Sequence, residues 1–385
     1  MDHKTFSYKY GFIGKDLELK QDIYMEIDDL GTIINLTYRD IEINTTLIQK
    51  GILIVPGFIN SHVHIGDSFA KEKGFNKDLI DVVAPTNGLK HQLLSKVSIS
   101  TKIEGIQNTL IEFLSNGITC FIDFREEGEQ GIGVLKTALR NSPIRHLILG
   151  RYNQINEIPL IFELADGVGL SSYTNKSPEE KAKLAENKIR NDKIISCHCA
   201  EVIRKENLIE EIVSDQIVDV IVHGTKLLKE DLLQLKRKKI SIVICPRCNG
   251  YFGVGFPPVL DMLGIGNLIS LGTDNIMANS PDLFEEMRYL YRLARIEGNK
   301  RNFMPLTPKI LLKMITINPA LIFGLESEIG SISIGKKADY FTIDLRDPNY
   351  FCQLSADVIH ALIVQRTRSE NIRQVFINGS LVFER

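Results

Sequence analysis

From residue 52 onward, short apolar runs rich in Ile, Val and Phe alternate with longer amphipathic stretches. This alternation is typical of repeated β-then-α units around a parallel sheet. The runs that resemble buried strands cover residues 57–64, 118–124, 145–151, 165–170, 193–198, 219–223, 240–246 and 268–274. The helical patterns cover residues 101–116, 131–141, 154–164, 178–192, 205–214, 228–239, 257–264 and 281–297. Eight such units predict an α/β fold, a (β/α)₈ TIM barrel over residues 51–325, with a doubly wound open sheet as the competing topology.

The two ends of the chain show a different pattern. Residues 1–50 and 326–385 contain short or alternating apolar segments separated by turn residues. Such segments predict hairpins, and we expect the two ends to pair into one small composite β-sandwich domain beside the barrel. Residues 65–100 form a long excursion after the first strand with no clear period. Loops in this position overhang the active face of a barrel, so this segment is a candidate lid.

Composition excludes several classes of protein. The 46 Lys and Arg residues nearly balance 48 Asp and Glu, and a formal charge of −2 disfavours a nucleic acid or an acidic membrane surface as partner. With 44% hydrophobic residues, the chain is globular rather than disordered. No apolar run approaches the roughly 18 residues that a membrane-spanning helix needs. The six scattered cysteines, Cys352 among them, fit a reducing compartment, and we expect a cytoplasmic protein.

Histidines and one aspartate fall at the carboxyl ends of predicted strands. His62 and His64 stand two apart on the first strand, so both imidazoles point to one face. His198, His223 and Asp274 end the fifth, sixth and eighth strands, at the edge where barrel enzymes keep their chemistry. Ordinary structural histidines are the alternative for an isolated pair, but the repeated placement at strand ends favours a metal site. Imidazoles with a carboxylate suit Zn²⁺ or Fe²⁺ better than Ca²⁺ or Mg²⁺.

Glu201 lies three residues beyond His198, where the chain leaves the fifth strand for the next helix. A metal-activated water needs a neighbouring group that takes its proton and delivers it to the leaving group. We therefore interpret Glu201 as the general acid and base. The alternative is an acid in the first turn of a helix, stabilised by the helix dipole.

A resemblance to a known family rests on six segments taken together. They are PGFINSHVH (56–64), HCAE (198–201), VHG (222–224), CPRCN (245–249), LGTDN (271–275) and IGKKADYFTID (334–344). In this order they resemble the amidohydrolase superfamily. More narrowly, they are similar to its branch of cytosine deaminase, guanine deaminase, chlorohydrolases and S-adenosylhomocysteine/methylthioadenosine deaminases. The resemblance covers nearly the whole chain, including the β domain built from both termini.

The resemblance implies a single divalent metal, Zn²⁺ in the first place, with Fe²⁺ or Mn²⁺ as alternatives. The implied ligands are His62, His64, His198 and Asp274. The resemblance also assigns Glu201 as the proton shuttle, and His223 as the group that hydrogen-bonds the attacking water or the substrate. Asp274 would also help to take the proton from the water. The implied reaction is attack of the activated water on an amidine-like ring carbon, with ammonia leaving after protonation through Glu201.

The fourth predicted strand bears on the number of metals and on the substrate. Binuclear members of the superfamily use a carboxylated lysine there, but the segment ADGVGLSSYTNK has no lysine before Lys176, so we predict one metal. Residues 172–174, with Ser-Pro at 177–178, resemble the fourth-strand motif of nucleoside-type deaminases, and Tyr173 is therefore a candidate substrate contact. That motif has a substrate-contacting histidine just upstream, whereas residues 169–171 here are Gly-Leu-Ser. We therefore do not expect an adenosine-like ligand to bind in the usual way.

Two further candidates for substrate binding follow other strands. Arg151 closes the third strand and offers charge-assisted hydrogen bonds to a substrate carboxylate or hydroxyl, with a surface ion pair as the alternative. Asn249 matches the family's asparagine after the seventh strand, with a turn-forming role as the alternative. The CxxC motif at 245–248 has no second CxxC at zinc-knuckle spacing, so we assign it neither a structural zinc nor a redox role.

These observations predict a metal-dependent hydrolase of non-peptide C–N bonds, an aminohydrolase of a purine, pyrimidine or related heterocycle. Two alternatives use the same site: a cyclic amide or amidine hydrolase, and a chlorohydrolase. A third is a non-catalytic relative that acts as an interaction module, whose mark would be the loss of site residues that this chain retains. The expected partner is a small heterocyclic molecule, and a homodimer is an open alternative to a monomer.

Overall fold

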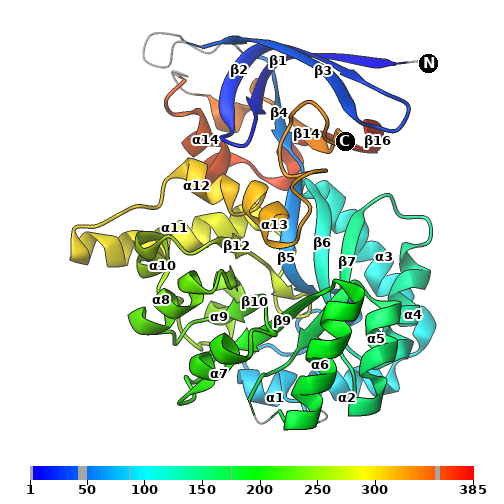
Figure 1. The fold of residues 1–385 in the computed structure, drawn as a ribbon. Helices are drawn as coiled ribbons and strands as arrows, with labels where there is room; N and C mark the ends of the chain where they lie inside the picture. The colour runs from blue at the N-terminus through cyan, green and yellow to red at the C-terminus, as the bar shows by residue number, and fades with distance from the viewer. Residues whose placement is uncertain (1–2, 42–49, 86, 175, 352–355) are drawn as a thin grey trace.

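The two ends of the chain meet in one sheet. The computed structural model describes residues 3–41, 50–85, 87–174, 176–351 and 356–385, so Cys352 lies outside the described residues. The described strands of the first sheet have the hydrogen-bonded order β16-β15-β14-β4-β1-β2-β3 (Figure 1). Their bounds are β1 Lys4–Ile13, β2 Glu18–Ile27, β3 Ile33–Asp40, β4 Ile52–Pro56, β14 Tyr340–Asp344, β15 Ile372–Ile377 and β16 Ser380–Glu384.

Strand β4 joins the N-terminal and C-terminal parts of this sheet. It pairs in parallel with β1 and antiparallel with β14, so the two ends of the chain do associate. Hydrogen bonds place all seven described strands in a single sheet, and the β-sandwich that we expected stays a prediction. Because β4 begins at Ile52, the sheet extends past the expected boundary at residue 50. The division into domains likewise stays a prediction.

The second sheet carries the predicted β-then-α units. Its described strands have the order β12-β11-β10-β9-β8-β7-β6-β5-β13, and all of their pairings are parallel. Their bounds are β5 Phe58–His64, β6 Ile118–Arg125, β7 Arg145–Gly150, β8 Gly167–Leu170, β9 Ile194–Cys199, β10 Val220–His223, β11 Ser241–Ile244, β12 Ile269–Leu271 and β13 Asp274–Asn275. Each strand range expected from the sequence overlaps at least one of these strands, although β6 and β9 each end one residue beyond the expected range.

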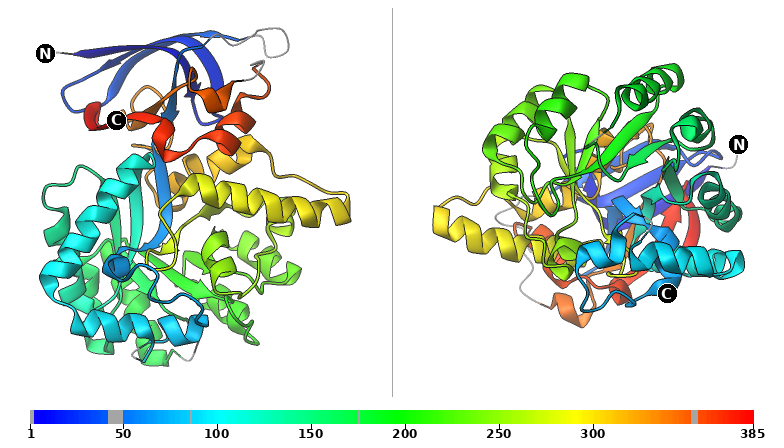
Figure 2. Two further views of the ribbon diagram at one scale, coloured as in Figure 1. Left: turned by 180° about the vertical axis from the view of Figure 1, so that it is seen from behind. Right: turned by 90° about the horizontal axis from the view of Figure 1, so that it is seen from below.

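Helices surround the strands of the second sheet, as the view from below in Figure 2 shows. Those that follow the strands are α3 Ile99–Ser115, α4 Gly128–Leu139, α5 Ile158–Leu164, α6 Pro178–Asn191, α7 Leu208–Asp215, α8 Lys229–Arg237, α9 Pro246–Tyr251, α10 Val259–Ile265 and α11 Leu283–Arg301. Outside the segment at 65–100, the other helices are α12 Pro308–Lys313, α13 Ile317–Ile322, α14 Ile359–Arg366 and the 3₁₀ turns η2 Ile155–Glu157, η3 Pro348–Tyr350 and η4 Ser369–Asn371. Within the described ranges, no helix is both long and apolar enough to cross a membrane.

The segment at 65–100 is more regular than the sequence suggested. It contains the 3₁₀ helix η1 Ile65–Ala70 and the helices α1 Leu79–Val83 and α2 Leu89–Lys96. Helix α1 has five residues and α2 has eight, so each makes fewer than three turns. Helices this short do not repeat the apolar spacing often enough to give a recognisable period.

The split eighth strand brings the two edges of the second sheet together. Strand β12 pairs with β11, whereas β13, which begins three residues after β12 ends, pairs with β5. The last strand therefore contacts both the seventh strand and the first. The sheet consequently curls into a TIM-like barrel, and the carboxyl ends of its strands face one common edge.

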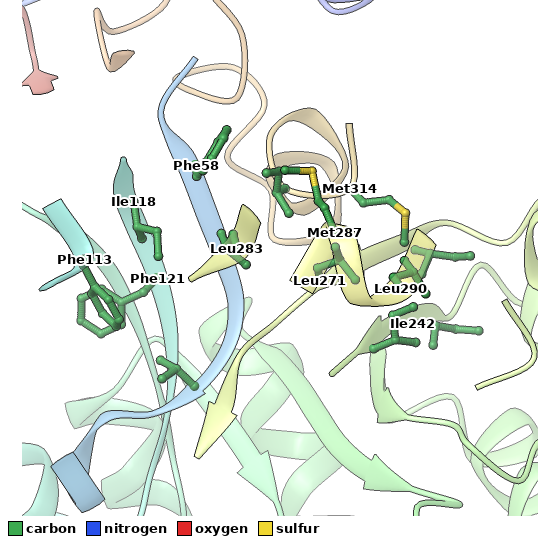
Figure 3. Packing of buried hydrophobic residues seen from close by; sticks show 14 of the residues in the cluster. Phe58, Phe113, Ile118, Phe121, Ile242, Leu271, Leu283, Met287, Leu290 and Met314 are labelled. Carbon is green, nitrogen blue, oxygen red and sulfur yellow. The ribbon is translucent and has the colours of Figure 1, made fainter. Parts of the chain in front are cut away.

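Phe58, the first residue of β5, lies where the two sheets meet. Its ring packs edge-to-face against Phe284 of α11 and Phe341 of β14, with ring centroids 5.0 Å and 4.8 Å away. Leu283 and Met287 of the same helix belong to the same buried cluster (Figure 3). Burial of apolar side chains is the main favourable contribution to folding, so this contact fixes the first barrel strand to the terminal sheet.

Asn60 and Thr273 connect the first and last barrel strands through a pair of buried hydrogen bonds. The Asn60 Nδ2 donates to Thr273 Oγ1 at 2.7 Å, and the Thr273 N–H donates to Asn60 Oδ1 at 3.1 Å. Neither side chain is accessible to solvent. The pair therefore holds Thr273, which lies in the break of the eighth strand and directly precedes Asp274, against the first barrel strand.

We predict that Asn60→Ala lowers the free energy of unfolding by about 1–3 kcal/mol, because it leaves buried polar groups of Thr273 without partners. Asn108→Ala is the matched control, since Asn108 lies exposed on α3, and we expect it to change stability by less than about 0.5 kcal/mol. Urea unfolding of both variants measures the difference. Equal losses in the two variants would contradict a role for Asn60 in closing the barrel.

Candidate metal centre

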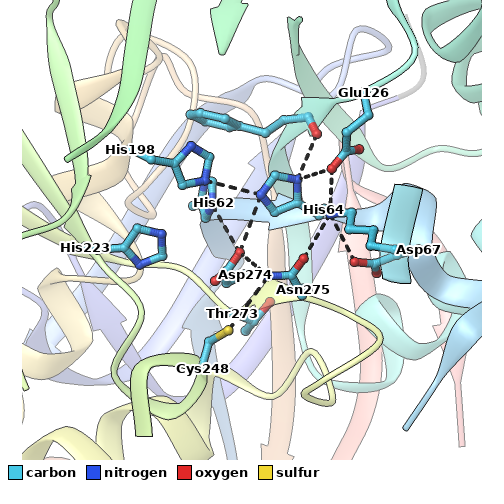
Figure 4. Close-up of polar contacts among 12 residues, drawn as sticks. His62, His64, Asp67, Glu126, His198, His223, Cys248, Thr273, Asp274 and Asn275 are labelled. Carbon is cyan, nitrogen blue, oxygen red and sulfur yellow. Dashed lines mark hydrogen bonds and ion pairs between the residues drawn. The ribbon is translucent and has the colours of Figure 1, made fainter. Parts of the chain in front are cut away.

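Four histidines and one aspartate converge at the carboxyl edge of the barrel (Figure 4). The Nε2 atoms of His64 and His198 are 3.3 Å apart, and Asp274 Oδ1 lies 3.3 Å from His62 Nε2 and 3.5 Å from His64 Nε2. One ligand atom from each of His62, His198, His223 and Asp274 lies within 4.8 Å of the others. The structure therefore brings together all five side chains that the sequence analysis placed at strand ends.

Parallel strands and two unusual backbone conformations aim these side chains at one point. His62 and His64 both lie on β5, and alternation along the strand turns them to the same side. His223 and Asp274 have φ values of 74° and 60°, in the left-handed region that residues other than glycine rarely adopt. Non-glycine residues in this region are held there by their surroundings and cluster at functional sites.

Hydrogen bonds to the outer ring nitrogens decide which form His64 and His198 adopt. The His198 Nδ1 lies 3.0 Å from the carbonyl oxygen of Leu170, and the His64 Nδ1 lies 3.1 Å from that of Phe124. A carbonyl oxygen only accepts, so each Nδ1 carries the proton and each Nε2 presents a lone pair. Burial lowers the pKa of His64 to about 3 and lowers the pKa of His198 well below its usual value, so both rings are neutral near pH 7.

The unprotonated Nε2 atoms of His64 and His198, together with the Asp274 carboxylate within 3.5 Å of His64, form a set of donors suited to a cation. Neither His64 nor His198 has a proton to share across the 3.3 Å between their Nε2 atoms. His62 is fully buried, and neither of its ring nitrogens has a hydrogen-bond partner among the described residues. Nitrogen and carboxylate donors are the ligands that Zn²⁺ and Fe²⁺ prefer. The donor set and its unmet lone pairs therefore match a divalent transition-metal ion.

His223 carries its proton on the other ring nitrogen from His64 and His198. The Nδ2 of Asn249 donates to His223 Nδ1 at 3.1 Å, so the proton of the neutral ring is on Nε2. Burial lowers the pKa of His223 to about 4, which keeps the ring neutral. The Nε2–H of His223 lies 3.5 Å from Glu201 Oε2. His223 is thus set up as a hydrogen-bond donor, whereas His64 and His198 are set up as acceptors.

Glu201 and Asp274 have pKa values shifted in opposite directions. Burial, followed by the charge of Asp274, raises the pKa of Glu201 well above its usual value. Burial alone would also raise the pKa of Asp274, but contact with His62 and the neighbouring imidazoles lowers it well below its usual value. Such opposed shifts in adjacent carboxyl groups are typical of an acid and base pair. The first turn of α7 begins only at Leu208, so Glu201 does not cap that helix.

A cavity of about 390 Å³ opens beside these residues. His64, His198, His223, Glu201 and Asp274 line its floor. One wall comes from the segment at 65–100, through the apolar residues of and after α1, which are Leu79, Ile80, Val83, Ala84 and Pro85. The expectation that this segment overhangs the active face therefore agrees with its position, and its apolar side chains face the space where a substrate would lie.

Arg151 also lines the cavity, just past the end of β7. Its Nε is buried and has no hydrogen-bond partner among the described residues. Burial, followed by the charge of nearby Arg125, lowers the pKa of Arg151. The structure shows no surface ion pair for this side chain within the described ranges. A guanidinium with unmet hydrogen-bonding capacity is thus available to a ligand in the cavity.

The structure places Tyr173 and Asn249 away from the cavity wall. Tyr173 is fully buried, and its hydroxyl donates to Asp215 Oδ2 at 2.7 Å, while Ser171 and Ser172 line the cavity in its place. Tyr173 is therefore not among the residues that line this cavity, and its role as a substrate contact stays a prediction. Asn249 contacts His223 and, at 3.4 Å, Glu201 Oε1, so it supports the two groups that face the cavity.

Lysine and cysteine side chains near the site have other partners. The Nζ of Lys176 bonds Glu180 Oε1 at 2.6 Å and the hydroxyl of Tyr152 at 2.9 Å. It therefore does not serve as a bridging ligand in this conformation. The thiol of Cys248 lies 3.9 Å from Asn275 Nδ2, and burial raises its pKa, which disfavours the reactive thiolate.

Three polar residues that surround the histidines were not predicted from the sequence. Glu126 and Asn275 are buried beside His64 and Asp274 (Figure 4), and the buried Lys90 contacts both of them. Glu126 follows directly after β6, so the strand-end rule that identified the histidines could have found it. Asn275 is the last residue of β13 and is open to the same argument. Lys90 lies on α2, which has no comparable signal in the sequence.

The chain is similar in sequence to archaeal and bacterial proteins over most of its length. The chain is 38% identical over 306 residues to an uncharacterized protein of Methanocaldococcus jannaschii, covering 74% of this chain and 77% of that protein. It is 28% identical over 399 residues to a 5-methylthioadenosine/S-adenosylhomocysteine deaminase of Thermoanaerobacter pseudethanolicus, covering 94% and 88% of the two chains.

A solved structure shares the fold at low sequence identity. The atrazine chlorohydrolase of Arthrobacter aurescens, complexed with zinc, superposes with a TM-score of 0.78 at 16% identity, covering 98% of this chain and 94% of that one. The sequence pattern of the amidohydrolase family matches residues 53–382, which include every residue of the candidate metal centre. This chain therefore belongs to the amidohydrolase family.

Proposed function

We propose that this protein is a metal-dependent aminohydrolase that releases ammonia from an amino-substituted heterocycle such as a purine or a pyrimidine. The observation that carries the proposal is the pair of bare imidazole nitrogens of His64 and His198, 3.3 Å apart, beside Asp274 and next to the buried Glu201. Metal ligands and a proton-transfer group thus share one cavity. The deaminase among the relatives supports the same class of reaction.

A single divalent ion suits the donor set. His62, His64, His198 and Asp274 would hold it, since His223 offers a protonated Nε2 rather than a lone pair. The zinc in the atrazine chlorohydrolase with the same fold supports Zn²⁺, with Fe²⁺ or Mn²⁺ as alternatives. When bound, the metal supplies Lewis acidity, which lowers the pKa of a water molecule and orients it for attack.

The side chains around the metal centre divide the proton transfers between them. Asp274, ionised because its pKa is low, accepts a proton from the attacking water. Glu201, whose pKa is raised by burial, receives this proton and delivers it to the leaving nitrogen. His223 donates from Nε2 to the oxygen of the attacking water or to the substrate, and Asn249 keeps the proton of His223 on Nε2.

The cavity indicates how a substrate would be held. The apolar wall from α1 fits the face of a heterocyclic ring, and Arg151 provides hydrogen bonds to a carboxylate, carbonyl or hydroxyl group on it. No histidine stands at residues 169–171, where nucleoside-type deaminases have a substrate contact. We therefore propose a heterocycle that binds differently from adenosine.

A panel of aminated and chlorinated heterocycles, assayed together with metal analysis of the same sample, tests the reaction class. We expect release of ammonia from at least one aminated ring. Release of chloride, or ring opening without ammonia, would instead support a chlorohydrolase or a cyclic amide hydrolase using the same residues. Absence of any turnover in metal-loaded protein would favour a non-catalytic role.

We predict that Glu201→Gln lowers kcat by about 10²–10⁴-fold, because the amide cannot carry the proton to the leaving group. The metal content should match that of the wild type, since Glu201 lies outside the proposed ligand set. Glu206→Gln, an exposed substitution five residues further along, is the control and should leave kcat unchanged. Turnover near the wild-type rate in Glu201→Gln would refute the proton-transfer role.

We predict that His198→Ala and Asp274→Ala each reduce the bound metal well below one ion per chain, because each removes a ligand. His146→Ala, a substitution at a partly buried histidine on β7, should leave metal content unchanged. Elemental analysis after dialysis measures the difference. Prolonged chelation of the wild type should abolish activity, and readdition of Zn²⁺ should restore it; unaltered metal in both ligand variants would show that the ligand set is wrong.

A further inference from the structure

Lys90 of α2 is a buried lysine among the polar residues beside the metal centre, and it lines the same cavity as the histidines. Its side chain is 2% exposed. Its Nζ lies 2.5 Å from Glu126 Oε1, 2.9 Å from Asn275 Oδ1 and 3.2 Å from Asp67 Oδ2, three partners that Figure 4 labels. The contact with Asn275 is a hydrogen bond, and the contacts with Glu126 and Asp67 are ion pairs. The Lys90 ammonium is thus held by two carboxylates and one amide oxygen.

One partner of Lys90 leads to His64. The Glu126 Oε1 that contacts Lys90 also lies 2.7 Å from His64 Nδ1, and the second oxygen of Glu126 accepts from Arg125 Nη2 at 2.7 Å. Both carboxylate oxygens are thus fixed by cations. A carboxylate at the outer nitrogen of a metal-binding histidine sets the ring orientation and raises the basicity of the inner nitrogen.

A second partner of Lys90 leads to Asp274. The Asn275 side chain accepts from Lys90 through Oδ1 and donates from Nδ2 to Asp274 Oδ1 at 3.0 Å. Because Lys90 can only donate, it decides which way round the amide of Asn275 stands. The amide in turn presents an N–H to the carboxylate oxygen that lies 3.3 Å from His62.

We propose that Lys90 is a positioning residue of the metal centre, which holds His64 through Glu126 and Asp274 through Asn275. This inference rests on the proposed function, since it concerns two of its four proposed metal ligands. Lys90 comes from the segment at 65–100, whereas its three partners follow β5, β6 and the split eighth strand. Helix α2 follows the apolar cavity wall at 79–85 in the sequence. The position of α2 in the fold therefore affects the geometry of the proposed ligands.

A purely structural ion pair is the competing explanation, and the chain offers a matched control. Lys102 on α3 is also buried, with a side-chain exposure of 5%, and its Nζ lies 2.6 Å from Glu127 Oε1. Neither Lys102 nor Glu127 contacts a proposed ligand in the described structure. Removing one member of a buried pair destabilises a protein wherever the pair lies. Only a positioning role predicts an additional effect on the metal.

The test compares Lys90→Met with Lys102→Met in the full chain. The zinc dissociation constant is measured by competition with a chromophoric chelator, and the cobalt-substituted protein is examined by visible absorption. We expect Lys90→Met to bind zinc about 10–100-fold more weakly and to shift the cobalt absorption bands, as happens when supports of metal ligands are lost. Lys102→Met should keep the wild-type zinc affinity and cobalt spectrum even if its stability falls.

Wild-type zinc affinity and an unchanged cobalt spectrum in Lys90→Met would overturn the inference. If Lys90→Met does not fold, Glu126→Gln replaces it, because glutamine keeps the size of the side chain but removes the charge shared between Lys90 and His64. Unchanged zinc affinity in that variant would overturn the inference equally. Failure of the wild-type protein to bind any divalent metal would instead overturn the proposed function, so the two failures are distinguishable.

Discussion

The unprotonated Nε2 atoms of His64 and His198 face each other across 3.3 Å, with the Asp274 carboxylate beside them. Without a cation, this arrangement places three groups of lone pairs together in a buried space, which is unfavourable. The fold maintains it by using the outer nitrogen of each ring, which is bonded to a backbone carbonyl of a neighbouring barrel strand. The barrel therefore fixes the tautomers as well as the positions of the ligands.

The break in the eighth strand is what allows Asp274 to join ligands from the first strand. Gly272 lies within the break, and a Cβ there would approach the backbone nitrogen of His62 to 2.8 Å, so a larger residue would push the strands apart. Asn60 and Thr273 tie the two strands together at this close approach. Asp274 then adopts its positive φ, which turns the carboxylate toward the histidines. The geometry of the ligands thus depends on the same residues that close the barrel.

The sequence predicted those parts of the site that follow from strand ends. The alternation of strands and helices placed His198, His223 and Asp274 at one edge, because parallel strands of a barrel share that edge. Tyr173 was proposed from motif resemblance, whereas in the structure it is buried and its hydroxyl donates to Asp215 of α7. Lys90 could not be predicted, because its partners are distant in sequence and α2 is too short to show a helical period.

The residues around the metal centre fall into two groups, each held together by its own contacts. Glu201, His223 and Asn249 contact one another, and their shifted pKa values and tautomers suit the transfer of protons. Glu126, Lys90 and Asn275 form the other group. Glu126 and Lys90 form an ion pair, and the group also contacts the proposed ligands His64 and Asp274. Under the proposed function, the site moves protons while it keeps its metal, and two separate groups of residues serve these two requirements. Groups that change charge during a reaction do not then also have to hold the ligands.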